Sequence, residues 1–143
     1  RPEANAEAFE DGWLKTGDVA YLDDEGYLFI VDRIKDLVIR GGENIGCAEV
    51  EAALLALDPV IEASVYAVPD ARLGEEVGAT LYSQDSLDIA EIQTQLAFHI
   101  AKFKVPRYIH TQTEPLPRIA SGKIDKRTLR SIAVSRLGLA TDV

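Results

Sequence analysis

The stretch DRIKDLVIRGGENI, residues 32–45, combines two kinds of backbone within fourteen residues. Polar and apolar residues alternate over its first part, which is typical of a β-strand, and we expect residues 37–40 to be extended. The alternation breaks at Gly41-Gly42, because glycine adopts conformations that other residues avoid. The stretch therefore predicts a strand followed by a turn, and a loop that meets a ligand is the alternative.

Strands and helices are predicted to alternate around this stretch. Residues 19–22 and 27–31 flank a polar turn that ends in Gly26, which predicts a hairpin. We expect further strands over 60–68, 77–82 and 107–111, and helices over 48–57, from Asp88 onward and from about Asp125 onward. The predicted fold class is α+β, a small sheet with flanking helices, preceded by the hairpin.

Apolar residues at helical spacing predict which face of each helix is buried. The expected stripes are Val50, Ala53, Leu54 and Leu57; Ile89, Ile92, Leu96 and Ile100; and Leu129, Ile132 and Ala133.

Length and composition restrict the class of protein. A chain of 143 residues that is 47% hydrophobic can bury one core. No apolar run approaches the roughly 20 residues that a membrane span needs. The single cysteine, Cys47, excludes an intrachain disulfide and favours a reducing, cytoplasmic location. The absence of methionine leads us to expect that the chain is a piece of a longer polypeptide.

The net charge of −9 is unevenly distributed. Residues 1–97 hold 6 Lys and Arg against 21 Asp and Glu, a net of −15, and residues 98–143 hold 9 against 3, a net of +6. The acidic part argues against a nucleic-acid or membrane-surface partner for the whole chain. The basic part suits a small phosphorylated ligand, or simply a solvated helix and tail.

Two charged residues near the hairpin are candidates for ligand binding. Asp18 follows Thr16-Gly17, and a carboxylate in such a turn can accept hydrogen bonds from both hydroxyls of a ribose. An Asp that caps backbone amides is the alternative. Arg33 presents a planar fork suited to hydroxyl or phosphate oxygens, or to a surface ion pair.

Two cationic stretches near the C-terminus could also carry chemistry. Lys123 ends the stretch 117–123, which is not a phosphate-binding P-loop because Pro117 stands where such a loop needs glycine. A loop lysine can stabilise a developing oxyanion or phosphate, or can merely be solvated. Residues 102–107 place three cations around Phe103, which suits a nucleotide or the C-terminus of a helix. We interpret Cys47 as structural, and His99 and His110 lack metal-ligand spacing.

The order of these features carries a resemblance that none of them carries alone. GWLKTGDVAYLDDEGYLFIVDRIKDLVIRGGENIGCAEVE, residues 12–51, followed by PLPRIASGK, residues 115–123, resembles the C-terminal part of an adenylate-forming acyl-CoA synthetase. That superfamily also contains peptide-synthetase adenylation domains and beetle luciferases. The resemblance covers residues 1–130, and departs from the family at Cys47, where many relatives have proline, and at Ile119, where they have threonine or a similar residue.

The resemblance implies a division into domains and a set of site residues. Residues 1–34 would end the large N-terminal domain and its linker, and 35–143 would form the C-terminal lid, with the hinge at Lys35. The implied roles are ribose binding for Asp18 and Arg33, catalysis of adenylation for Lys123, contact with pantetheine for Gly41, Gly42, Glu43 and Asn44, and contact with the CoA nucleotide for Phe103 and Arg107. No residue of the chain is assigned to a metal.

The implied reaction joins a carboxylic acid, expected to be a fatty or related acyl acid, to CoA. ATP and Mg²⁺ would be bound mainly by the large domain, an acyl-AMP would form first, and CoA would be the co-substrate. The lid's partners would be its own N-terminal domain and the substrates, with a lysine acetyltransferase and deacetylase acting on Lys123. We expect the chain alone to be inactive. The alternatives are a non-catalytic binding or folding module, or the lid of a peptide-synthetase-like or luciferase-like enzyme.

Overall fold

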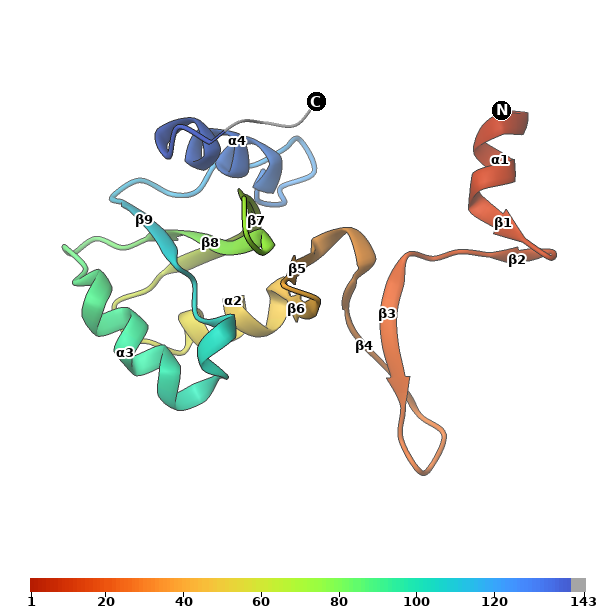
Figure 1. Cartoon of the computed structure of the whole chain (residues 1–143), viewed down its shortest axis with the longest axis horizontal. Coiled ribbons are helices and arrows are strands. Elements are labelled where there is room, and N and C mark those ends of the chain that lie inside the picture. The colour runs from red at the N-terminus through yellow and green to blue at the C-terminus, as the bar shows by residue number, and fades with distance from the viewer. Residues whose placement is uncertain (140–143) are drawn as a thin grey trace.

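The computed structural model of the chain describes residues 1–139, in which short hairpins precede a mixed sheet flanked by helices (Figure 1). The elements in chain order are α1 Pro2–Ala8, β1 Phe9–Glu10, β2 Trp13–Leu14, β3 Asp18–Leu22, β4 Leu28–Arg33, η1 Ile34–Asp36, β5 Leu37–Arg40, β6 Glu43–Gly46, α2 Cys47–Leu55, β7 Glu62–Asp70, β8 Gly74–Tyr82, α3 Ile89–His99, η2 Lys102–Lys104, β9 Tyr108–Gln112 and α4 Lys126–Arg136. The predicted α+β class is confirmed.

The N-terminal segment, residues 1–33, stands apart from the main sheet (Figure 1). Strands β3 and β4 form the predicted hairpin, antiparallel and with a register shift between Val19 and Ala20. The carboxylate of Asp23 closes its turn by accepting hydrogen bonds from the amides of Glu25 and Tyr27, at 3.0 and 2.8 Å. None of residues 1–33 is buried, because a two-stranded ribbon has no layer packed on either face.

The main sheet has five strands, with β6, β5, β8 and β7 in that order and antiparallel, and β9 parallel to β8. Strand β8 lies at its centre. It pairs with β7 along its whole length, with β5 at Gly74 and with β9 from Gly78 to Tyr82. Helices α2 and α3 cover one face of the sheet, and α4 covers the other (Figure 1).

Strand β6 is an element that the sequence did not predict. Glu43 and Asn44 have little preference for strands, so only the turn before them was expected. The two-residue turn at Gly41 and Gly42, with φ of +58° and +91°, returns the chain antiparallel to β5. Ile45 then faces the core with no exposed surface, which is what holds the strand in place.

Two hydrophobic clusters fill the two faces of the sheet. The larger joins α2 and α3 to the sheet, and the smaller joins α4 to Tyr66 and Val68 of β7. Two predicted core residues are wrong. Ile89 is the first residue of α3 and is 36% exposed, and Ile132 is 42% exposed because the buried face of α4 runs through Leu129, Ala133 and Val134. No helix within residues 1–139 combines the length and apolar character needed to cross a membrane.

Candidate functional site

Asp18 and Arg33 are brought together by the hairpin. They are cross-strand partners at the open end of β3 and β4, and Arg33 Nε donates a hydrogen bond to Asp18 Oδ1 over 3.0 Å. Thr16 Oγ1 accepts from the amide of Asp18, at 3.2 Å. Only 22% of the Asp18 side chain is exposed, whereas 54% of the Arg33 side chain is. Among the described residues, no hydrogen bond is made by Asp18 Oδ2, which leaves one carboxylate oxygen to accept from a ligand.

Lys35 lies in the short 3₁₀ turn η1, which joins the hairpin to the main sheet. The amide of Ile34 donates to the carbonyl of Gly17 over 2.8 Å, so the turn starts from the base of the hairpin. On the other side, Asp32 Oδ2 accepts from the amide of Ala48, at 3.1 Å, in the first turn of α2. The backbone around Lys35 therefore connects the N-terminal segment to the main sheet, and few other contacts link these two regions.

Gly41 and Gly42 form an exposed turn at one edge of the sheet, and Glu43 and Asn44 begin β6. The amide of Gly41 donates to the carbonyl of Leu73 over 2.9 Å, which ties the turn to the segment before β8. A Cβ on Gly41 would lie 3.0 Å from Leu73 Cδ2, whereas a Cβ on Gly42 would meet nothing within 4 Å. The outer surface of the turn is thus open to a ligand approaching the backbone.

Phe103 lies in the short turn η2, which follows α3, and Arg107 directly precedes β9. Phe103 is 36% exposed, and the ammonium of Lys104 lies 6.0 Å from its ring centroid while pairing with Glu49. The Arg107 guanidinium lies 5.4 Å from the ring of Tyr108 and 3.8 Å from Asp70 Oδ2. Arg107 is therefore partly held by carboxylates of the sheet, whereas part of Phe103 remains exposed.

Lys123 lies on an exposed turn that precedes α4. Its carbonyl accepts from the amide of Ile119 at 2.9 Å, and Gly122, with φ of +84°, completes the turn. No side chain within residues 1–139 pairs with the Lys123 ammonium. The structure therefore holds the backbone of Lys123 and leaves its charge available.

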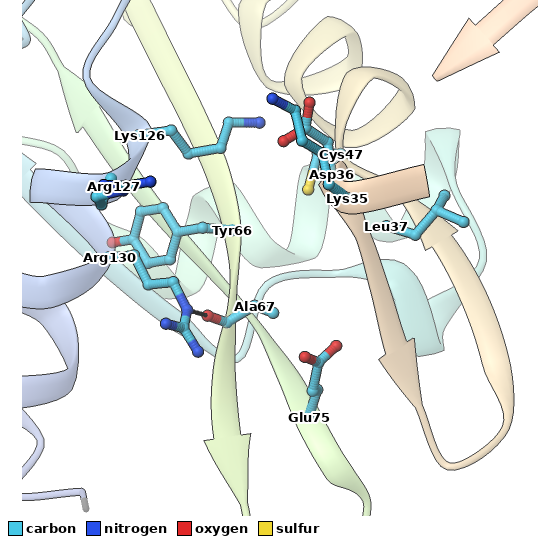
Figure 2. A pocket seen from close by; sticks show the side chains of 10 residues that line it. All are labelled: Lys35, Asp36, Leu37, Cys47, Tyr66, Ala67, Glu75, Lys126, Arg127 and Arg130. Carbon is cyan, nitrogen blue, oxygen red and sulfur yellow. Dashed lines mark hydrogen bonds between the residues drawn. The ribbon is translucent and has the colours of Figure 1, made fainter. Parts of the chain in front are cut away.

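A cavity of about 500 Å³ lies between the turn η1 and helix α4, and the sequence did not predict it (Figure 2). Lys35 lines it, whereas Asp18, Gly41 and Lys123 do not. Its wall also holds Asp36, Leu37, Cys47, Tyr66, Ala67, Glu75, Lys126, Arg127 and Arg130. The signal in the sequence was the spacing of the last three cations, which places them on one side of a helix.

Two of the cations that line this cavity are held by neighbouring groups. The ammonium of Lys126 pairs with Glu51 Oε1 at 3.0 Å, and Arg130 Nε donates to the carbonyl of Ala67 at 2.8 Å (Figure 2). Burial raises the pKa of the Cys47 thiol to about 12, so the thiol stays protonated and is a poor nucleophile. No group of three metal-ligating side chains occurs within residues 1–139.

Residues 49–123, more than half of the chain, match the family described as AMP-binding enzyme C-terminal domain. The chain belongs to this family.

Individual relatives of this AMP-binding C-terminal domain are CoA ligases. The chain is 46% identical over 131 residues to 2-succinylbenzoate–CoA ligase of Bacillus pumilus, covering 92% of this chain and 27% of that one. It is 40% identical over 132 residues to the long-chain-fatty-acid–CoA ligase FadD13 of Mycobacterium tuberculosis, covering 91% and 26%. The chain thus spans about a quarter of the length of the curated relatives it matches.

A solved structure gives the same result at the level of the fold. The o-succinylbenzoate CoA synthetase of Bacillus subtilis, in complex with its acyl-adenylate intermediate, superposes with a TM-score of 0.83 and 41% identity. The match covers 91% of this chain and 27% of that one. A structure of that enzyme in complex with ATP and a magnesium ion matches with a TM-score of 0.81.

Proposed function

We propose that the chain is the C-terminal part of a longer ATP-dependent carboxylate–CoA ligase, in which residues 35–143 form a lid and residues 1–34 end the large domain and its linker. The similarity to CoA ligases over more than 90% of the chain supports this. The distribution of burial supports the boundary, since Val38 is the first buried residue. Lys35, in the turn between the two regions, is the proposed hinge.

The first half-reaction forms an acyl-AMP. A carboxylate oxygen of the acid bonds to the α-phosphorus of ATP, and the bond from that phosphorus to the bridging oxygen breaks, so that pyrophosphate leaves. The ammonium of Lys123 would neutralise the negative charge shared by carboxylate and phosphate oxygens as they approach. The observation that carries this role is the exposed lysine without an ion pair among the described residues, on a turn whose backbone is held.

The nucleotide in that step would be oriented from the hairpin. Asp18 Oδ2 would accept from the ribose hydroxyls, while Arg33 holds Oδ1 and prevents the carboxylate from rotating away. Mg²⁺ supplies neutralisation of the ATP phosphates when it is bound. Because residues 1–139 contain no cluster of metal ligands, we assign ATP phosphates and Mg²⁺ mainly to the large domain and derive no step through the metal.

The second half-reaction uses another side of the lid. Rotation about Lys35 would withdraw Lys123 and bring the turn at Gly41 and Gly42 to the same site. The thiol sulfur of CoA then bonds to the acyl carbon, its proton passes to solvent, and AMP leaves with the electrons of the acyl–oxygen bond. Gly41, Gly42, Glu43 and Asn44 would line the pantetheine arm, because the open side of Gly42 admits an approaching chain. Phe103 and Arg107 would contact the CoA nucleotide.

The acid that is activated, the cellular location and the regulation are further parts of the proposal. We favour a fatty or related acyl acid and a cytoplasmic enzyme. The relatives are named for different acids, 2-succinylbenzoate and long-chain fatty acids, as expected if the acyl pocket lies in the rest of the enzyme. Acetylation of Lys123 by a lysine acetyltransferase would abolish adenylation by removing the charge, and a deacetylase would restore it.

The test is to separate the two half-reactions in the full-length ligase. ATP–pyrophosphate exchange reports adenylation over a panel of carboxylic acids, and CoA consumption from supplied acyl-AMP reports thioester formation. Lys123→Ala should lower exchange by roughly 10²- to 10³-fold and spare the second reaction. Gly42→Leu should spare exchange and block the second reaction. Normal exchange by Lys123→Ala would refute the role of Lys123, and adenylation without CoA transfer in the unmodified enzyme would favour another acceptor.

A further inference from the structure

The turn that carries Lys123 is tied to a distant strand by one carboxylate. Glu62, the first residue of β7, uses both of its oxygens on the segment before α4. Glu62 Oε2 accepts a hydrogen bond from the amide of Leu116 over 2.7 Å, and Glu62 Oε1 forms an ion pair with Arg118 Nη2. Glu62 thereby fixes two points of this segment from 54 and 56 residues away.

The guanidinium of Arg118 continues this connection to the residue before Lys123. Arg118 Nη1 donates to the carbonyl of Gly122 over 2.8 Å. That carbonyl belongs to the peptide group whose nitrogen is the amide of Lys123, so its orientation sets the direction in which Lys123 leaves the turn. A continuous chain of contacts thus runs from the sheet through Glu62 and Arg118 to the backbone of Lys123.

The turn itself is closed by backbone hydrogen bonds that need this support. The amide of Gly122 donates to the carbonyl of Ile119 at 2.9 Å, and Arg118 pairs with Ile124 as an isolated bridge. A small hairpin of this kind is only marginally stable without packing against another element. Leu116, 2% exposed, anchors one end and Ile124 packs against the α4 cluster at the other, but Ile119, between them, is 47% exposed. The Glu62–Arg118 pair adds a polar attachment to the strand of the hairpin that carries Arg118.

The accessibility of the two side chains favours a structural connection over ligand binding. The Glu62 side chain is 18% exposed, so its bonds to Arg118 and Leu116 are shielded from water more than those of a surface pair. Arg118 is 47% exposed, but its two terminal nitrogens already donate to Glu62 and Gly122. A guanidinium committed in this way is poorly placed to take a phosphate as well.

We propose that Glu62 and Arg118 are positioning residues that hold Lys123 in the direction required for adenylation. This inference rests on the proposed function, because it acts through Lys123. It does not involve the second half-reaction, for which the lid presents the turn at Gly41 and Gly42. Loss of the connection should therefore slow one half-reaction and leave the other unchanged.

The experiment uses the full-length ligase with three substitutions. Glu62→Gln keeps an acceptor for the Leu116 amide but loses the charge, and Arg118→Gln removes the bridge to Gly122. Each should lower the kcat of ATP–pyrophosphate exchange roughly ten- to a hundredfold, with little change in the KM for ATP, since a misplaced catalytic group costs up to that much. Arg118→Lys keeps the positive charge but lacks the two terminal nitrogens of the guanidinium. Its kcat for exchange should lie between those of Arg118→Gln and the unmodified enzyme. CoA consumption from supplied acyl-AMP should not change.

The matched control is Glu10→Gln, which removes the carboxylate of another ion pair, with Lys15 at 3.2 Å, in the N-terminal segment. It should leave both half-reactions unchanged. If Glu62→Gln and Arg118→Gln are poorly soluble, Arg118→Lys carries the same test.

A Lys123→Ala background separates positioning from a general structural role. In that background the substitutions at Glu62 and Arg118 should cause no further loss of exchange, because no ammonium remains to be positioned. A further loss there, or equal losses in both half-reactions, would overturn the proposal. The proposal would also be overturned if Glu62→Gln and Arg118→Gln both showed normal exchange while Lys123→Ala lost it. In that case the role of Lys123 would stand. If Lys123→Ala itself exchanges normally, the proposed function fails and the positioning role fails with it.

Discussion

The N-terminal segment and the main sheet are both rich in apolar residues, but only the main sheet buries them. In the segment, Trp13 is 80% exposed, Leu28 64% and Ile30 65%. In the sheet, Val65, Val77 and Leu81 have no exposed surface, because α2 and α3 pack over that face. Burial is thus decided by whether a second layer is present rather than by composition. Under the proposed function, the large domain would cover the segment and bury these exposed apolar side chains.

The largest expected difference between the two regions is in the cost of losing a leucine side chain. Leu96→Ala should lower the free energy of unfolding by about 2 to 5 kcal/mol, because Leu96 of α3 has no exposed surface and its removal leaves a cavity. Leu28→Ala in β4 should change it by less than about 0.5 kcal/mol. Urea denaturation of the chain, followed by circular dichroism, gives both values. Comparable losses would show that the segment folds together with the sheet.

A smaller effect is expected where a side chain is added rather than removed. A Cβ on Gly78 of β8 would lie 2.8 Å from Tyr66 Cε2 and 3.0 Å from Val68 Cγ1. Tyr66 cannot yield easily, because it is 2% exposed and its hydroxyl is hydrogen-bonded to Thr80 at 2.7 Å. Gly78→Ala should therefore cost about 1 to 3 kcal/mol of unfolding free energy.

The control for this substitution lies on the exposed hairpin. Ala20→Val also adds side-chain volume to a strand, but it should change the unfolding free energy by less than about 0.5 kcal/mol. The same urea experiment measures both variants. A neutral Gly78→Ala would mean that the α4 face of the sheet is loosely packed.

Features decided by neighbours in sequence were predictable, and features decided across the sheet were not. Asp88 was expected to open a helix, and its carboxylate accepts from the amides of Ala90 and Glu91. The strand over Leu37–Arg40 was expected from its alternation. In contrast, the parallel pairing of β8 with β9 depends on how α3 crosses the sheet, which no local pattern encodes.

The candidate site shows the same division. The sequence motifs pointed to Asp18, to its partner Arg33 and to Lys123, but not to the residues that hold the turn of Lys123 in place. Glu62 meets Arg118 from 56 residues away, and its neighbours in the chain give no sign of this role. The ion pair between Arg40 and the buried Glu76, at 2.6 Å, likewise joins residues 36 apart. Contacts of this kind depend on the register of the strands that carry the two residues. They can therefore be identified from the structure but not from the sequence.

The join between the two regions should be sensitive to Asp32. Its carboxylate caps the first turn of α2 from the end of the hairpin, because the N-cap residue Gly46 has no side chain to do so. Asp32→Ala should cost about 1 kcal/mol of unfolding free energy, as the loss of a helix cap usually does. It should also speed tryptic cleavage after Arg33 and Lys35, since the connecting turn would open more often. Asp32→Asn keeps an acceptor and should retain most of the stability; equal cleavage rates in all three proteins would contradict a capping role.

The smallest expected effect is on how the free energy of unfolding depends on pH, and it involves a histidine of the main sheet. His110 of β9 lies beside Thr80 on the face that α4 covers, near Arg136 and Tyr66. Burial, with a contribution from the positive charge of Arg136, lowers the pKa of His110 from its ordinary value of 6.5. As the pH falls below 6.5, the unfolded chain takes up a proton that the folded chain resists, so stability should decrease toward the lower pKa of the folded state. Asp70 and Asp125, whose pKa values are lowered by backbone hydrogen bonds, lose their contribution only below their ordinary value of 3.8.

This pH window allows His110 to be tested separately from the carboxylates. Thermal unfolding between pH 5 and pH 7.5 should show a shallower pH dependence for His110→Gln than for the unmodified chain. His99→Gln is the matched control, because it makes the same substitution at the exposed end of α3. Equal slopes in all three proteins would mean that His110 can take up its proton without disturbing the contact with α4. A pH dependence that His110→Gln reduces and His99→Gln does not would come from the packed face of the sheet. The exposed hairpin contains no histidine and cannot contribute to it.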